Sequence, residues 1–189
     1  MEKTGVLRLA GVLKILVTLT FCCNLIALLL VPGLAMMKGL GPLLSLTPYE
    51  NPVELPLRGA VLFLQSWAWV WSSGSYDVVL TVFLLFCGVC TAVILWQGRR
   101  VLDTVLAGTP FTLGNAGNLR RAAVCCFLIS GAALLRLTWG LWYYRSPAPL
   151  LTYNALFVPV FLMAGLLCLI MSALFRQAAE LKRENDLTI

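Results

Sequence analysis

The sequence predicts an all-α, integral membrane four-helix bundle, and three observations lead to this fold class. The chain of 189 residues is 60% hydrophobic, far above the share of a soluble domain. Its apolar residues gather into four runs, each long enough to cross roughly 30 Å of hydrocarbon. Its net charge of +6 comes from Lys and Arg residues at the ends of these runs. Since such charges orient a membrane protein, they do not by themselves indicate a nucleic-acid partner.

We expect one domain, residues 1–189, with spans at 15–37, 78–96, 122–144 and 155–174. The first run follows Lys3, Arg8 and Lys14, as a signal peptide would. It is longer than a signal-peptide core, so we interpret it as a retained transmembrane helix.

The segments between the spans are expected to differ in character. The outer loop, 38–77, is rich in proline, and its apolar part 57–71 is too short to cross. Trp67, Trp69 and Trp71 favour an anchor at the lipid–water boundary, with a lid over an outer pocket as the alternative. The tail, 175–189, is expected to extend the last helix before it frays.

The loop at 97–121 is expected to begin and end as helix. Residues 99–107 contain good helix formers and an Arg99/Asp103 pair at i,i+4. Gly108 followed by Pro110 is a stop signal. Thr112 or Asn115 can then begin the third helix.

Basic residues predict the orientation. With four spans, the side that holds both termini and loop 97–121 carries ten Lys or Arg residues, against three on the other side. The positive-inside rule therefore places both termini in the cytoplasm, at the plasma membrane of a bacterium.

Few residues offer chemistry. The chain has no histidine, and its seven cysteines all lie in apolar runs. Cys87 and Cys90 fit a CxxC pattern, but thiols in lipid are poorly reactive, so a membrane thiol oxidoreductase is the weakest reading. We expect no catalytic residue, cofactor or metal.

Arg136 is the only charged residue that lies well inside a predicted span, which makes it a functional candidate. It could bind an anion or ligand, or it could be structural, either reaching the headgroups over Trp139 or pairing with Asp77. No Asp or Glu lies within a span, which weakens an ion-coupled transporter.

The cytoplasmic face carries the remaining candidates. There the basic residues of loop 97–121 would face the acids of the tail, either as internal ion pairs with attraction to anionic lipid or as a docking surface for a cytoplasmic protein. The candidates are Arg99, Arg100, Arg120, Arg121, Glu180, Glu184 and Asp186.

Two short segments carry a family resemblance. GTPFTLGNAGNLRR after the second span and FRQAAELKRENDLTI at the end of the chain resemble the signatures of a bacterial family of small four-helix integral membrane proteins of unknown function. That family reads roughly Gly-x-Pro-Phe-[Ser/Thr]-x-Glu-Asn, then Leu-Arg, and ends near Leu-x-x-Glu-x-Asp-Leu-Thr-[Ile/Val]. The matching residues are Gly108, Pro110, Phe111, Thr112, Asn115, Leu119 and Arg120, then Leu181, Glu184, Asp186, Leu187, Thr188 and Ile189. Gly114 stands where the family usually has Glu.

The resemblance implies a partner rather than a reaction. Genes of the family often neighbour one for a small Cro/CI-type helix-turn-helix regulator. We therefore expect a non-enzymatic, regulatory or sensory membrane protein that docks such a regulator at its inner face and does not bind nucleic acid directly. The alternative is a small transporter or exporter component that uses Arg136. The sequence leaves the ligand and the oligomeric state open.

Overall fold

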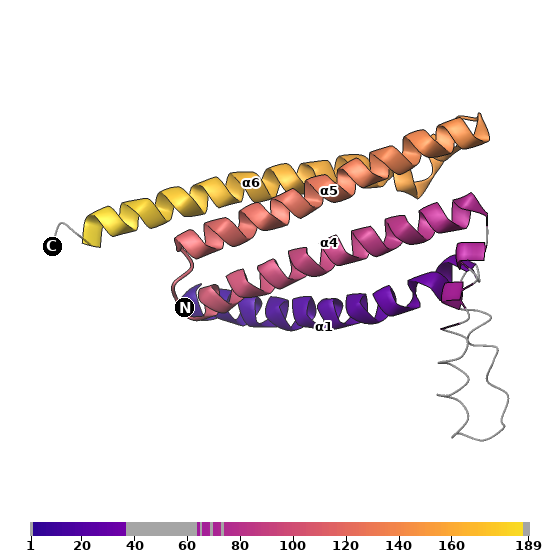
Figure 1. The fold of residues 1–189 in the computed structure, drawn as a ribbon. Coiled ribbons are helices and arrows are strands. Elements are labelled where there is room, and N and C mark those ends of the chain that lie inside the picture. The colour runs from indigo at the N-terminus through magenta and orange to yellow at the C-terminus, as the bar shows by residue number, and fades with distance from the viewer. Residues whose placement is uncertain (1, 37–63, 65, 69, 73, 187–189) are drawn as a thin grey trace, which may run out of the picture. The chain divides into compact units, whose positions relative to one another are not determined.

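The computed structural model describes residues 2–36, 64, 66–68, 70–72 and 74–186 (Figure 1). Within these ranges it contains α1 (Glu2–Met36), α4 (Ser75–Leu106), α5 (Leu113–Tyr144), the short 3-10 helix η1 (Ala148–Leu151) and α6 (Tyr153–Asp186), and no strand. Four of these helices are long and apolar enough to cross a membrane, which confirms the all-α, four-span prediction.

The helices are longer than the predicted spans. α1 begins at Glu2, thirteen residues before the predicted start at residue 15, because Lys3, Arg8 and Lys14 do not interrupt the helix. α4 ends at Leu106 just before Gly108, as the stop signal predicts, and α6 continues through Asp186. Of segment 57–71, the described residues 64, 66–68, 70 and 71 are helical. The rest of that segment, Trp69 included, and residues 38–56 of the outer loop lie outside the described residues.

The chain forms two compact units. One comprises Met1–Asn24 with Val89–Ile189, and the other comprises Leu25–Gly88. In the second unit the first turn of α4 closes on the carbonyl of Gly74, which accepts from the N–H of Asp77 at 3.1 Å. Gly88 admits the side chain of Leu28, because a Cβ at Gly88 would lie 2.5 Å from Leu28 Cδ2.

In the first unit, α5 is the most buried helix. Its buried positions are mostly small residues, among them Ala116, Ala123, Ser130 and Gly140. Small side chains allow close approach of helices in a membrane, where packing and hydrogen bonds replace the hydrophobic effect. α6 lies along α5 and leaves most of its own apolar residues exposed, as expected of a surface that contacts lipid (Figure 1).

Two hydrogen bonds set the register of α5 and α6. The hydroxyl of Ser130 donates to the carbonyl of Val158 at 2.9 Å, and that of Ser172 donates to the carbonyl of Ala116 at 2.7 Å. Between them, Gly165 faces the ring of Phe127, where a Cβ would lie 2.8 Å from a ring carbon. These contacts fix which residues of the two antiparallel helices lie at the same level.

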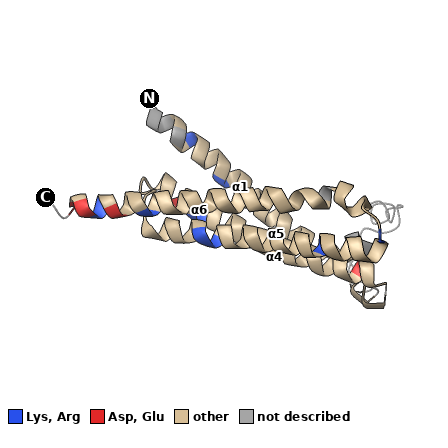
Figure 2. Cartoon of the chain, turned by 90° about the horizontal axis from the view of Figure 1, so that it is seen from above, with Lys and Arg blue, Asp and Glu red and all other residues tan. Residues whose placement is uncertain are grey.

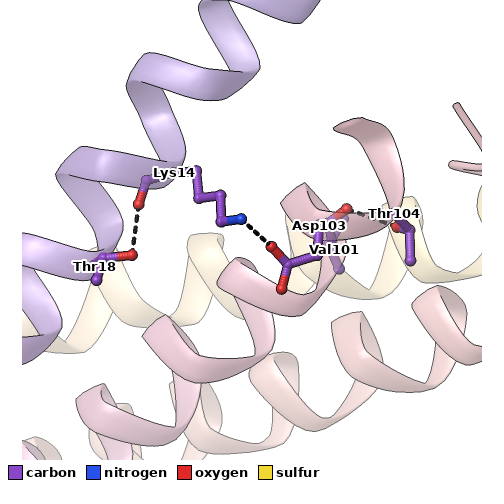
Figure 3. Close-up of polar contacts among 5 residues, drawn as sticks. All are labelled: Lys14, Thr18, Val101, Asp103 and Thr104. Atoms are coloured by element: carbon purple, nitrogen blue, oxygen red, sulfur yellow. Dashed lines mark hydrogen bonds and ion pairs between the residues drawn. The ribbon is translucent and has the colours of Figure 1, made fainter. Parts of the chain in front are cut away.

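Within the same unit, α1 contacts the C-terminal part of α4 at Phe21 and at Lys14. The rings of Phe21 and Trp96 lie 5.9 Å apart. Farther toward the start of α1, Lys14 Nζ lies 2.8 Å from the carboxylate of Asp103 (Figure 3).

Candidate functional site

Ala107–Thr112 joins α4 to α5 at one end of the first unit, which is called here the turn end. Most of the predicted site residues lie toward this end. Gly108 takes φ +75°, a conformation that a residue without Cβ adopts at little cost. The Thr112 hydroxyl caps α5 by accepting from the N–H of Asn115 at 3.2 Å. Of the two predicted starts for the third helix, the structure therefore selects Thr112.

Asn115 holds the turn closed from inside. Its side chain is only 1% exposed, and its Nδ2 donates to the carbonyl of Pro110 at 2.7 Å and to the hydroxyl of Thr104. Thr104 in turn donates to the carbonyl of Val101 at 2.7 Å (Figure 3). Because an amide is costly to bury unless it is hydrogen-bonded, this network accounts for an Asn at this position in structural terms.

α6 passes the turn end and continues beyond it. The rings of Phe111 and Phe175 lie 5.4 Å apart, next to the bond from Ser172 to Ala116. Residues Arg176–Asp186, called here the projecting segment, therefore extend about 16 Å past the turn, at 1.5 Å per residue. Charged residues of both signs gather at this end of α6 (Figure 2).

The four predicted docking arginines form a belt on α4 and α5. Antiparallel pairing at Thr104 and Asn115 places Arg100, four residues before Thr104, level with Arg120, five residues after Asn115. Arg100, Arg120 and Arg121 are exposed and Arg99 is half-buried. Within the part of the chain that the structure describes, none of the four has an ion pair or a hydrogen bond from its side chain.

The predicted Arg99/Asp103 pair is wrong. Asp103 instead pairs with Lys14 of α1 (Figure 3). Lys14 lies on another helix that is far away in the sequence. The i,i+4 rule compares residues within one helix, so it could not predict this contact.

The predicted docking acids lie on the projecting segment. Glu180 Oε1 accepts from Arg176 Nε at 2.8 Å within α6. This hydrogen bond, and after it the charge of Glu180, raise the pKa of Arg176 above its ordinary value. Glu184 and Asp186 follow one and two turns later and are exposed.

The structure does not bring the arginine belt and these acids together. Measured from the level that Ala116 and Ser172 share, Arg120 lies four residues along α5 and Glu180 lies eight residues the other way along α6. Twelve residues of helix correspond to about 18 Å. The belt and the projecting segment are therefore separate surfaces.

With this geometry in view, comparison with known proteins gives a family. The family described as "Protein of unknown function (DUF2975)" matches residues 66–189, well over half of the chain. The chain belongs to this family. No curated protein and no solved structure matches it. The DUF2975 match covers α4, α5 and α6 with the turn end and the projecting segment, and it leaves α1 outside.

Arg136 also lies within the DUF2975 match, on the part of α5 remote from the turn end. Its guanidinium donates to Asn154 Oδ1 on α6 at 3.1 Å and is half-buried. This hydrogen bond links α5 to α6. Its pairing with Asp77 stays a prediction.

Four cysteines of this DUF2975 chain, Cys90, Cys125, Cys126 and Cys168, are thiols that form no disulfide. Cys90 lies beside Cys125 of α5, and Cys126 lies beside Cys168 of α6. The described residues contain no group of three or more His, Cys, Asp or Glu side chains placed to hold a metal ion.

Among the polar residues that were not singled out from the sequence is a buried glutamine. Gln97 on α4 is 7% exposed, and its Oε1 is buried without a hydrogen-bond partner. It lies seven residues from both Cys90 and Thr104, the α4 residues that meet α5, and so faces α5 between them. The seven-residue spacing of Cys90, Gln97 and Thr104, which places them on one face of a helix, was the sequence signal that could have identified Gln97.

Proposed function

We propose that this DUF2975 protein is a non-enzymatic regulatory membrane protein that docks a small cytoplasmic transcription regulator on the projecting segment of α6. The observation that carries the proposal is the helix that continues past the turn end, where Glu180–Asp186 are all exposed. A membrane anchor has no need of such an extension.

The surface of the projecting segment suits a protein partner. Leu181 is 66% exposed and is surrounded by charged residues of both signs. A helix this short is marginal in water on its own, but continuity with α6 and the Arg176–Glu180 pair stabilise it. An apolar anchor on a preformed helix is the usual means by which a helix binds a groove on a partner.

The kind of partner rests on the family resemblance and on the predicted orientation. A cytoplasmic C-terminus places the projecting segment where a DNA-binding protein is found. The neighbouring genes of the family suggest a small helix-turn-helix regulator. Docking would hold that regulator at the membrane and make its availability depend on the state of the membrane protein.

Affinity purification from native membranes in a mild detergent tests the proposal. The docking variant combines Leu181→Asp with Glu184→Lys. The matched control is Leu151→Asp, which changes a fully exposed leucine of η1 at the opposite end of the same unit. We expect a helix-turn-helix protein to be recovered with the wild type and the control and lost with the docking variant. Equal recovery with all three would contradict the proposal.

The alternative function, a transporter component, would use Arg136. Its hydrogen bond to Asn154 favours a structural role instead. Loss of an efflux phenotype in Arg136→Gln, with normal amounts of folded protein in the membrane, would support transport.

A further inference from the structure

The arginine belt has positive charge with no counter-ion in the described protein, at a level where neighbouring residues are still apolar. From the register of Ser172 with Ala116, Arg120 and Arg121 lie level with Cys168 and Leu167 of α6. Leu167 is 62% exposed. Farther toward the turn end, Ile170 and Leu174 of α6 are also exposed.

This level matches the boundary between hydrocarbon and headgroups. Trp96, one turn before Arg99 and Arg100 on α4, is 46% exposed, and tryptophan prefers this boundary. A cytoplasmic protein would have to pass the exposed apolar side chains of Ile170 and Leu174 to reach the belt. At a boundary of this kind, the anions at hand are the phosphates of membrane lipids.

The face of α5 below the belt suits an acyl chain. Val124 and Leu128 lie three and seven residues after Arg121, so the three residues share one helix face, and both apolar side chains are exposed. A charged head above an apolar track matches the shape and chemistry of a phospholipid. Guanidinium groups bind phosphate through paired hydrogen bonds and remain charged at any physiological pH.

We propose that the arginine belt (Arg99, Arg100, Arg120 and Arg121) binds the headgroups of anionic phospholipids, and that the acyl chain of the lipid held at Arg121 lies along Val124 and Leu128. The site neutralises the unpaired guanidiniums and fixes the depth of α4 and α5 in the membrane. It is independent of the proposed function, because the docking surface lies about 18 Å away on α6.

Native mass spectrometry of the full chain in a neutral detergent tests this site. The protein is titrated separately with phosphatidylglycerol, phosphatidylcholine and inorganic phosphate. We expect phosphatidylglycerol to bind at concentrations at least about tenfold lower than phosphatidylcholine, since each basic residue near an anionic surface adds to the attraction. Equal binding of the two lipids, or displacement of phosphatidylglycerol by millimolar inorganic phosphate, would overturn the lipid site.

Two variants locate the site. Replacing the four belt arginines by glutamine is expected to abolish the preference for phosphatidylglycerol. The matched control, Arg176→Gln with Lys182→Gln and Arg183→Gln, removes positive charge from α6 and is expected to keep the preference. If the control loses the preference as fully as the belt variant, the site is not at the belt.

Basic residues also orient the chain, so the belt variant can fail to insert. The salt dependence of phosphatidylglycerol binding to the wild-type protein then provides the test. Binding through guanidinium and phosphate is expected to weaken as salt rises from 50 to 500 mM, about tenfold or more. Binding that is insensitive to salt would contradict a headgroup site.

Discussion

Asn115, which matches the family signature in GTPFTLGNAGNLRR, stabilises the turn between α4 and α5. Its amide fastens the turn to α4 through Pro110 and Thr104. Asn115→Ala removes both bonds and leaves the Pro110 carbonyl without this donor, so we expect the free energy of unfolding to fall by about 2 kcal/mol. Asn118→Ala, one turn along α5 at a half-buried position, is the matched control and is expected to change stability by less than about 0.5 kcal/mol. Unfolding in a mild detergent measures both, and equal effects would show that the bonds of Asn115 are unimportant.

Replacing a glycine by alanine should change stability in opposite directions on α5 and on α6. A Cβ at Gly165 would press against the ring of Phe127, so Gly165→Ala is expected to destabilise the protein by about 1 kcal/mol or more. Gly131 has nothing within 4 Å of its Cβ position, and alanine favours a helix, so Gly131→Ala is expected to be neutral or stabilising by about 0.5 kcal/mol. Thermal unfolding in detergent distinguishes the two. A stabilising Gly165→Ala would mean that α5 and α6 do not approach there.

The buried Gln97 predicts a stabilising substitution. Its orphaned Oε1 carries a desolvation penalty that leucine of similar size would remove, so we expect Gln97→Leu to raise the free energy of unfolding by about 1 kcal/mol. Gln177→Leu, at an exposed position of α6, should leave it unchanged. A destabilised Gln97→Leu protein would indicate that this amide has a partner in the membrane.

At the scale of elements, the α5–α6 pair depends on hydroxyl groups that bond across the helices. Ser130→Ala and Ser172→Ala are each expected to lower stability by about 0.6 kcal/mol, the mean for such bonds in a membrane. The two bonds lie about 20 Å apart along α5, so their effects should add in the double variant. Thr138→Val is the control, because its hydroxyl bonds the Leu135 carbonyl of its own helix. Strong non-additivity would contradict two independent contacts.

The elements themselves were largely predictable, because their signals are local. The apolar runs gave the four spans, and Gly108 with Pro110 gave the end of α4 to within a residue. The extension of α1 from the predicted span back to Glu2 was not predicted, because an apolar run ends at Lys14 although charged residues continue a helix readily.

The contacts between elements were not predictable from one sequence. Lys14 and Asp103 are 89 residues apart in the chain, and nothing in their local surroundings marks them as a pair. The separation of Arg120 from Glu180 follows from the register of α5 and α6, which Ser172 and Phe175 set. The levels of the two residue sets along the helices could not be assigned from the sequence without that register.

At the scale of the whole molecule, the charged residues near the turn end lie at two levels along the helices. The arginine belt lies where exposed apolar side chains still flank it, and the projecting segment extends beyond the turn end. In our account, the first surface holds lipid and the second holds a regulator. This division requires the C-terminus to be cytoplasmic, as the distribution of basic residues predicts.

Photo-crosslinking in living cells tests the central proposal most directly. A photoreactive amino acid replaces Leu181 on the projecting segment or, as the control, Leu151 of η1, and crosslinked partners are identified by mass spectrometry. We expect a crosslink from Leu181 to a small helix-turn-helix protein and none from Leu151. If Leu181 crosslinks only to lipid or to proteins outside the cytoplasm, the projecting segment is not a cytoplasmic docking site.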